Sequence, residues 1–264
     1  MRKHHLSLFL ILILALFGCQ KEFLRVDSDT PSSIEKVIYR SNVDRIFSEF
    51  SFNTAGLLTT EKLKILEGAD SSEESISIVR DGNGNVIRTV VSDGISQDLV
   101  TNYQYDGSKV RYGTMVYNLG GSSVVDSVVF SIANKVSKTN HYFSLPGLGS
   151  IMDSYFEYTY DTRGNLTQVK NYVAGTPPDL SLFSTVTFEY DRMINPWYSN
   201  DDALIEFSGR LYTSPNNVTK ITEVSADPVY NASAVYAYQY GTDNRPLKGT
   251  RTEDGTTYQV EYIL

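Results

Sequence analysis

The stretch YTYDTRGNLT at residues 158–167 decides the fold of this chain. Its alternating aromatic residues, Tyr158 and Tyr160, predict a β-strand, because side chains two positions apart lie on the same face of a strand. Asp161 is suited to hydrogen-bond the backbone of the turn that follows, and Gly164 supplies the positive φ that closes a hairpin. The pattern therefore predicts two antiparallel strands joined by a tight turn.

The same pattern recurs along the chain. FSFNTAGLLT at 50–59 repeats it closely, and the other copies are weaker. Because large sheets twist and curl, we predict an all-β fold, a single antiparallel meander of about 15–17 strands rolled toward a half-barrel or shell. Its concave face carries the Tyr and Phe stripes. The turn anchors stand at positions 53, 81, 106, 134, 161, 191, 216 and 241, spaced 28, 25, 28, 27, 30, 25 and 25 residues apart.

Composition excludes several classes of protein. The chain has 264 residues, 41% of them hydrophobic, which is enough for one large core. A single cysteine rules out a disulfide scaffold. A net charge of −8 argues against nucleic acid as a partner, because phosphate backbones need a basic surface. The repeat runs without a linker, so we expect one domain at 34–264.

The N-terminus has the pattern of a processed export signal. Residues 1–18 carry Arg2 and Lys3 before an apolar stretch shorter than the roughly 20 residues that a membrane span needs. This stretch ends in LFGC, which resembles the lipobox of bacterial lipoproteins, with cleavage between Gly18 and Cys19. The resemblance implies that Cys19 carries diacylglycerol and an N-acyl chain such as palmitate, which anchors the protein in the membrane. The alternative is an ordinary signal peptide with a chance cysteine.

Residues 19–33 combine the lipidated cysteine with a flexible tether. The tripeptide QKE at 20–22 is similar to a signal that sends lipoproteins of some Gram-negative bacteria to the outer face of the outer membrane. We therefore expect an outer-membrane lipoprotein, displayed on the cell surface rather than facing the periplasm.

The hairpin pattern resembles the YD repeat of Rhs-type bacterial shell proteins. It is also similar to β-rich lipoproteins of unknown function whose hairpins share the aromatic-x-aromatic-Asp pattern. Only the copies at 50–59 and 158–167 match strongly. The resemblance implies a β-shell architecture and a location in the cell envelope, and it carries over no catalytic residue.

One long loop departs from the hairpin pattern and is the candidate binding site. It follows Asp191 and holds the single tryptophan of the chain. Aromatic rings on a loop stack on sugars or anchor a partner, and amides and carboxylates add hydrogen bonds. The alternative is that the loop folds over one end of the sheet and its tryptophan fills the open core. The candidate binding residues are Asn195, Trp197, Tyr198, Asp201 and Asp202.

The recurring tyrosines leave a similar choice open. They either pack the core of the rolled sheet or form an exposed aromatic platform for glycan or peptide. These residues are Tyr103, Tyr105, Tyr158, Tyr160, Tyr190, Tyr236, Tyr238 and Tyr240.

Catalytic and metal-binding patterns are weak. His141 is the only histidine beyond the leader and is expected to be a surface residue of a strand. Zinc needs three or four His and Cys ligands, and the DGNGN stretch at 81–85 lacks the later glutamate of a calcium loop. We therefore expect no metal and no cofactor. Paired carboxylates of a glycosidase could come from Glu157, Glu189, Asp191, Asp201 and Asp202.

These observations predict a non-enzymatic binding or scaffolding module whose partner is a glycan or an envelope protein. A carrier of an apolar ligand on the periplasmic side is the first alternative. An envelope glycoside hydrolase is the second.

Overall fold

The structure is a computed structural model of the chain. The leader, Cys19 and the tether lie outside the residues that it describes. Those residues are 35–41, 44–67, 70–95, 98–119, 122–132, 135–145, 147, 149–174, 180–198, 201–206, 213–253 and 255–263.

Sixteen strands follow one another along the chain, each antiparallel to the next, and this confirms the predicted all-β meander. The first eight are β1 (Lys36–Arg40), β2 (Asp44–Phe52), β3 (Leu58–Glu67), β4 (Asp70–Arg80), β5 (Val86–Ser92), β6 (Leu99–Asp106), β7 (Lys109–Leu119) and β8 (Ser122–Ile132). The others are β9 (Val136–Leu145), β10 (Gly149–Tyr160), β11 (Leu166–Ala174), β12 (Leu180–Ile194), β13 (Asn216–Ser225), β14 (Ala232–Tyr240), β15 (Pro246–Glu253) and β16 (Thr256–Ile263). Among the described residues, the short 3₁₀ helices η1 (Asp202–Glu206) and η3 (Pro228–Tyr230) lie in the connections after β12 and β13.

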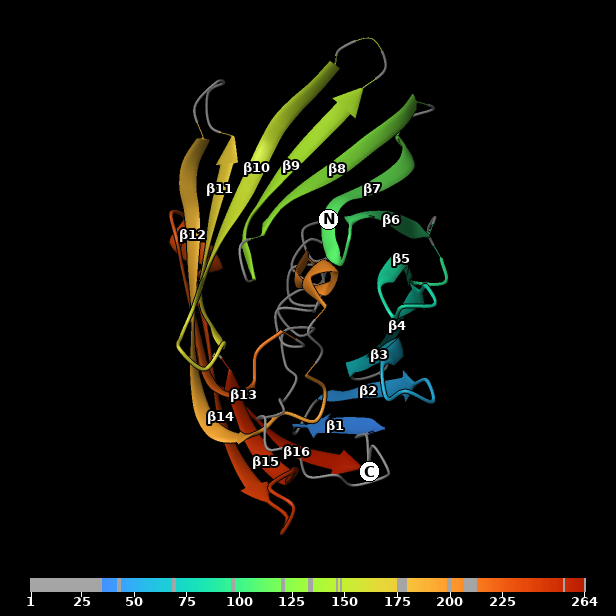
Figure 1. Cartoon of the computed structure of the whole chain (residues 1–264). Helices are drawn as coiled ribbons and strands as arrows, with labels where there is room; N and C mark the ends of the chain where they lie inside the picture. The colour runs from blue at the N-terminus through green and yellow to red at the C-terminus, as the bar shows by residue number, and fades with distance from the viewer. Residues whose placement is uncertain are drawn as a thin grey trace.

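The sheet closes into a full barrel, whereas the repeat by itself pointed toward a half-barrel or shell. The first strand pairs with the last, so that Lys36 lies opposite Ile263 and Arg40 opposite Gln259. Figure 1 shows this seam, where β1 runs beside β16 and the two ends of the colour scale meet. Closure leaves no open edge strand, so the backbone groups of both terminal strands are paired within the sheet.

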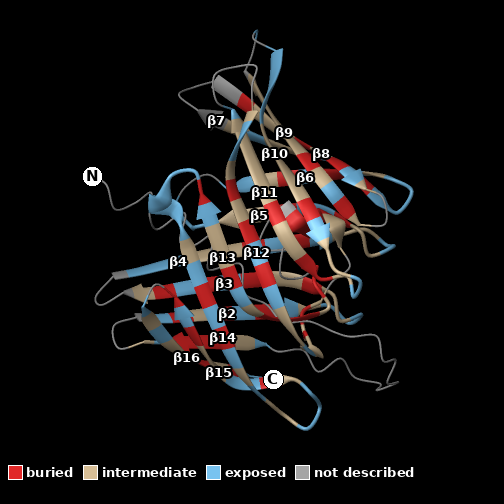
Figure 2. Cartoon of the chain, turned by 90° about the vertical axis from the view of Figure 1, so that its left-hand side faces the viewer, coloured by how far each residue is buried: buried red, intermediate tan, exposed pale blue. Residues whose placement is uncertain are grey.

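The barrel wall alternates between an apolar inner face and a polar outer face. In β3, Leu63 and Ile65 are buried while Lys62 and Lys64 are exposed. Figure 2 shows the same alternation of buried and exposed residues along many of the strands. The core therefore lies inside the barrel. Three of the eight recurring tyrosines are buried in that core and four more pack against it, as core packing requires. The eighth, Tyr240, lies with its ring centroid 5.8 Å from that of Tyr238.

One buried ion pair interrupts the apolar interior. The guanidinium of Arg251 has no exposed surface and pairs with the carboxylate of Glu253. The rings of Tyr39 and Tyr258 lie 5.7 and 5.6 Å from the guanidinium carbon. Guanidinium groups stack on aromatic faces. The two rings therefore pack beside a positive charge that burial has removed from water.

The predicted turns share one hydrogen-bonding pattern. Side-chain Oδ1 atoms of Asn53, Asp81 and Asp161 each accept two backbone N–H bonds of 2.8–3.0 Å, from the second and fourth residues after them. The glycine three positions after each has a φ of 74°, 87° and 87° in turn. The 81–85 stretch is therefore a hairpin turn. Anchor 106 is the last residue of β6, and anchor 241 stands in the connection after β14. Anchors 191 and 216 lie in the strands on either side of the long loop, and 134 lies outside the described residues.

Candidate functional site

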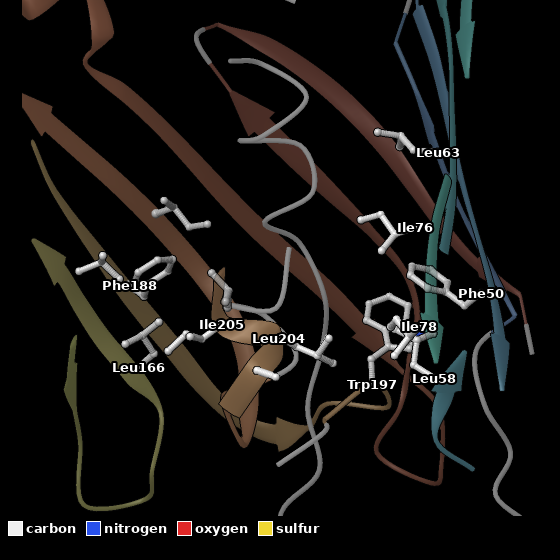
Figure 3. Packing of buried hydrophobic residues seen from close by; sticks show 14 of the residues in the cluster. Phe50, Leu58, Leu63, Ile76, Ile78, Leu166, Phe188, Trp197, Leu204 and Ile205 are labelled. Atoms are coloured by element: carbon white, nitrogen blue, oxygen red, sulfur yellow. The ribbon is translucent and has the colours of Figure 1, made fainter. Parts of the chain in front are cut away.

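The predicted binding loop between β12 and β13 enters the barrel and fills its centre. Trp197 is only 3% exposed, and its ring centroid lies 4.8 Å from that of Phe50 and 6.1 Å from that of Tyr262. Helix η1 adds Leu204 and Ile205, which are 2% and 1% exposed. Figure 3 shows Trp197 beside the β2–β4 wall and Ile205 directed toward the opposite wall. The apolar side chains of the loop belong to the core, so the loop is a plug whose tryptophan fills the interior of the barrel.

Two cations from different parts of the barrel wall contact the plug. Arg80, at the end of β4, donates to the carboxylate of Asp201 at 2.7 Å, and both side chains are largely buried. Arg80 also donates to the carbonyl of Gly84 at 2.8 Å. Before β9, Lys135 donates to the carbonyl of Thr213 at 3.1 Å, and its ammonium lies 5.7 Å from the ring centroid of Tyr198.

The other two candidate residues also serve the plug. Asn195 has no exposed surface, and its Oδ1 accepts from the backbone N–H of Trp197 at 2.9 Å. Burial raises the pKa of Asp202, and the nearby ammonium of Lys135 offsets part of that rise. Burial likewise lowers the pKa of Lys135. The structure thus brings all five candidates together, but in the wall and interior of the plugged barrel.

The remaining carboxylates named for a glycosidase occupy separate contacts. Asp191 accepts from the hydroxyl of Tyr240 and caps the start of the plug. Glu189 pairs with Lys220 at 3.2 Å on the outer wall. Glu157 also faces outward, opposite Lys170 in the register of β10 and β11.

The structure corrects the prediction for the single histidine of the domain. His141 faces the barrel interior, with its Nε2 atom 3.4 Å from the hydroxyl of Thr139 and its ring against the edge of Phe156. The reason is strand phase, because His141 alternates with outward-facing neighbours and lies opposite the buried Val128. Within the residues that the structure describes, no three His, Cys, Asp or Glu side chains gather as a metal site.

Sequence reasoning missed a row of side chains on the outer wall of β6–β12. Tyr155 and Tyr172 stack there with 4.3 Å between centroids, and the ammonium of Lys138 lies 3.6 Å from the centroid of Tyr155. Tyr112 is 48% exposed. We call this set the outer row, in which each member lies directly opposite the next in strand register: Gln104, Tyr112, Val129, Asn140, Tyr155, Tyr172 and Leu182.

A groove of about 460 Å³ opens at the β6–β8 end of the outer row. Gln104, Tyr112 and Val129 belong to both the row and the groove. Asp106 and Arg111 border it and form an ion pair of 3.3 Å. The repeat pattern did not identify these residues, because the outer tyrosines stand one position out of phase with the core stripes. Tyr155, for example, directly precedes the inward-facing Phe156. Strand phase is therefore the signal that could have found them.

The opposite wall carries ion pairs, and the ammonium of Lys36 lies 5.4 Å from the ring centroid of Phe47 there. Across β16, β1 and β2, Arg40 pairs with Glu261 at 2.7 Å, and Lys36 pairs with Glu49. Further exposed charges, Lys62 and Lys64, project from β3. Exposed apolar side chains also stand on other strands, among them Val224, Val235 and Leu247. The β6–β12 wall is therefore distinguished by its stacked tyrosine pair and its groove.

Comparison with known proteins shows the architecture and no more. No protein-family model matches the chain, and no curated protein matches it. A porin-like protein from Bacteroides uniformis has a similar structure, with a TM-score of 0.53, 14% identity, and 88% of this chain and 97% of that chain covered. A second porin-like protein, from Bacteroides vulgatus, aligns with a TM-score of 0.49 and 12% identity over 87% of this chain and 97% of that one. The likeness is one of fold alone. No helix among the described residues is long and apolar enough to cross a membrane.

Proposed function

We propose that this chain is a non-enzymatic glycan-binding module, tethered to the outer membrane by lipid on Cys19 and displayed on the cell surface. The observation that carries the binding role is the outer row with its groove. Contiguous exposed patches of aromatic and apolar side chains mark contacts with a ligand or a partner. Here the outer row crosses seven adjacent strands and contains the stacked pair Tyr155 and Tyr172.

The chemistry of the outer row suits a chain of sugars. Phenol hydroxyls and the amides of Gln104 and Asn140 offer donors and acceptors at the spacing of strands, about 4.8 Å. The half-exposed ring of Tyr112 offers an apolar surface for the C–H groups of a sugar. The adjoining groove, at about 460 Å³, is within the usual size range of small-ligand sites. A linear glycan would therefore cross the strands along the row and place one unit in the groove.

The outer wall supports a barrel that stands in water. Exposed, outward-facing charges include Lys62 on β3, Arg88 on β5 and Lys220 on β13. A lysine or arginine on the lipid-facing side costs about 2–4 kcal/mol at the bilayer midplane, and membrane barrels are apolar outside and polar inside. This barrel has the reverse arrangement. The lipid on Cys19, rather than the strands, would therefore hold it at the membrane.

The plug weighs against the alternative of a carrier for apolar ligands. That role would need the inward aromatic stripes to enclose free space. In the centre of the barrel, the side chains of Trp197, Leu204 and Ile205 already occupy the interior between the walls (Figure 3). The outer row needs no such space, because it is open to solvent.

Binding to an array of neutral polysaccharides tests the proposal. The full chain, purified in detergent, is compared with the Tyr112→Ala and Tyr172→Ala variants. We expect each variant to weaken binding to the retained glycan about tenfold, which equals about 1.4 kcal/mol. The exposed Tyr112→Ala should leave the melting temperature unchanged. Tyr230→Ala, an exposed tyrosine outside the row, is the matched control. Wild-type affinity in both row variants would refute the proposed site. Binding of an envelope protein that is lost in the row variants would show that the ligand of the row is a protein and not a glycan.

A further inference from the structure

A second groove lies on the far side of the barrel from the groove at the β6–β8 end of the outer row. It has a volume of about 520 Å³ and is formed by β14, β15, β16 and β1. Strand β15 is eight strands from β7 in either direction around the closed sheet, so the two grooves open on opposite walls. Gly249 lines this groove, and a Cβ there would come within 2.4 Å of the backbone carbonyl oxygen of Ala237, so β15 approaches β14 closely at this point.

The walls of this groove are polar and carry one excess positive charge. Arg40 and Glu261 neutralise each other through their ion pair of 2.7 Å. Lys248 lies directly opposite Glu261 in the register of β15 and β16, and it helps to lower the pKa of that carboxyl after the stronger effect of Arg40. The groove therefore contains two cations and one anion.

Neutral hydrogen-bonding groups surround these charges. Gln239 lies opposite Lys248, and Gln259 lies opposite both Thr250 and Arg40. Both glutamines and the lysine are exposed to solvent. Their amides and the threonine hydroxyl both donate and accept, as a ligand rich in hydroxyl groups requires. The groove thus differs from the one beside the outer row, where an exposed tyrosine contributes.

We propose that this second groove binds an acidic sugar through its carboxylate, with Lys248 as the main charge partner. A single excess positive charge matches a carboxylate, which carries one negative charge. A phosphate monoester carries about 1.5–2 negative charges at neutral pH and would call for more cations. The glutamines and Thr250 meet the hydroxyl groups of the same sugar.

Calorimetry on the full chain in detergent tests this site with three probes: trigalacturonate, neutral maltotriose and glucose 6-phosphate. We expect trigalacturonate to bind, and Lys248→Gln to weaken it about tenfold, because hydrogen bonds to charged groups are among the stronger ones. Glu261→Gln removes the competing carboxylate and is expected to strengthen binding. The matched control is Lys220→Gln, which removes the same charge from an ion pair on β13.

Other outcomes would overturn the site. Equal losses in Lys248→Gln and Lys220→Gln would mean attraction by overall charge. Tighter binding of glucose 6-phosphate, or absence of trigalacturonate binding, would exclude a uronate site. Loss of trigalacturonate binding in the Tyr112→Ala variant would show that the acidic sugar binds at the outer row. Because the two sites lie on opposite walls, failure of the outer row leaves this prediction standing, and the reverse also holds.

Discussion

The indole ring of Trp197 packs on the phenyl ring of Phe50, with 4.8 Å between their centroids and 35° between their planes. Phe50 belongs to β2 and Trp197 follows β12, two strands that lie six positions apart by the shorter way around the barrel. The contact therefore crosses the interior. A barrel of sixteen strands encloses more space than its own wall residues fill, and the plug supplies the missing apolar side chains.

Replacing Trp197 with alanine is expected to destabilise the barrel by about 3–5 kcal/mol, the usual loss for a buried aromatic ring. Urea unfolding followed by tyrosine fluorescence measures the change. Trp197→Phe should recover part of the stability, since it restores a ring against Phe50. Lost glycan binding with an unchanged unfolding midpoint would instead return Trp197 to the role of a ligand-binding residue.

The ion pair between Arg80 and Asp201 is expected to stabilise the plug in its place inside the barrel. Asp201→Asn leaves the guanidinium buried without its counter-charge, and we predict a loss of about 3 kcal/mol. Combining it with Arg80→Met removes both charges and should restore much of the stability. Equal stability of the single variant and the wild type, measured by thermal unfolding, would show that the ion pair contributes nothing.

Asp161 is expected to make the barrel less stable in acid. Burial acts to raise the pKa of this carboxyl, but hydrogen bonds from Asn165 and Arg163 outweigh burial and hold it below the ordinary value of 3.8. A depressed pKa stabilises the fold above the unfolded value, and that contribution is lost as the pH falls through the folded value. Asp161→Asn should keep the turn, as Asn53 does naturally, and remove this part of the acid sensitivity.

The pH dependence is measured by urea unfolding between pH 3 and pH 6. Asp161→Ala serves as the comparison, because it removes the turn bonds at every pH and should lower stability by about 1 kcal/mol throughout. An Asp161→Asn variant that stays as acid-sensitive as the wild type would mean that other carboxyls control the transition.

The proposed tether predicts where the barrel is found in a cell. With a C-terminal epitope tag, the full chain should fractionate with the outer membrane, and protease added to intact cells should remove the tag. Cys19→Ser should release the barrel as a soluble protein, because its charged outer wall gives it no affinity for lipid. Protection of the tag until lysis would place the domain in the periplasm. Retention of Cys19→Ser in membranes would contradict a purely lipid-anchored barrel.

Much of the fold is readable from the residues alone. The turns at Asn53, Asp81 and Asp161 depend on side chains that bond their own backbone within four residues, so the local pattern reveals them. Strand phase is equally local, and it places Tyr158 on the same face as Tyr160. The pairing of Lys36 with Ile263 has no such signal, because it depends on how far the whole sheet coils.

The sequence by itself determined the strands, their hairpins and the gathering of the tyrosine stripes on one face, since these follow from period and turn chemistry over a few residues. That this face is the core of the barrel was decided by the tertiary structure. Only the tertiary structure decided that Trp197 points into the barrel, because the space it fills is bounded by strands far away in the chain. The same holds for the outer row. Tyr112, Tyr155 and Tyr172 come together through the register of successive strand pairs, and that register is a property of the closed sheet rather than of any one segment.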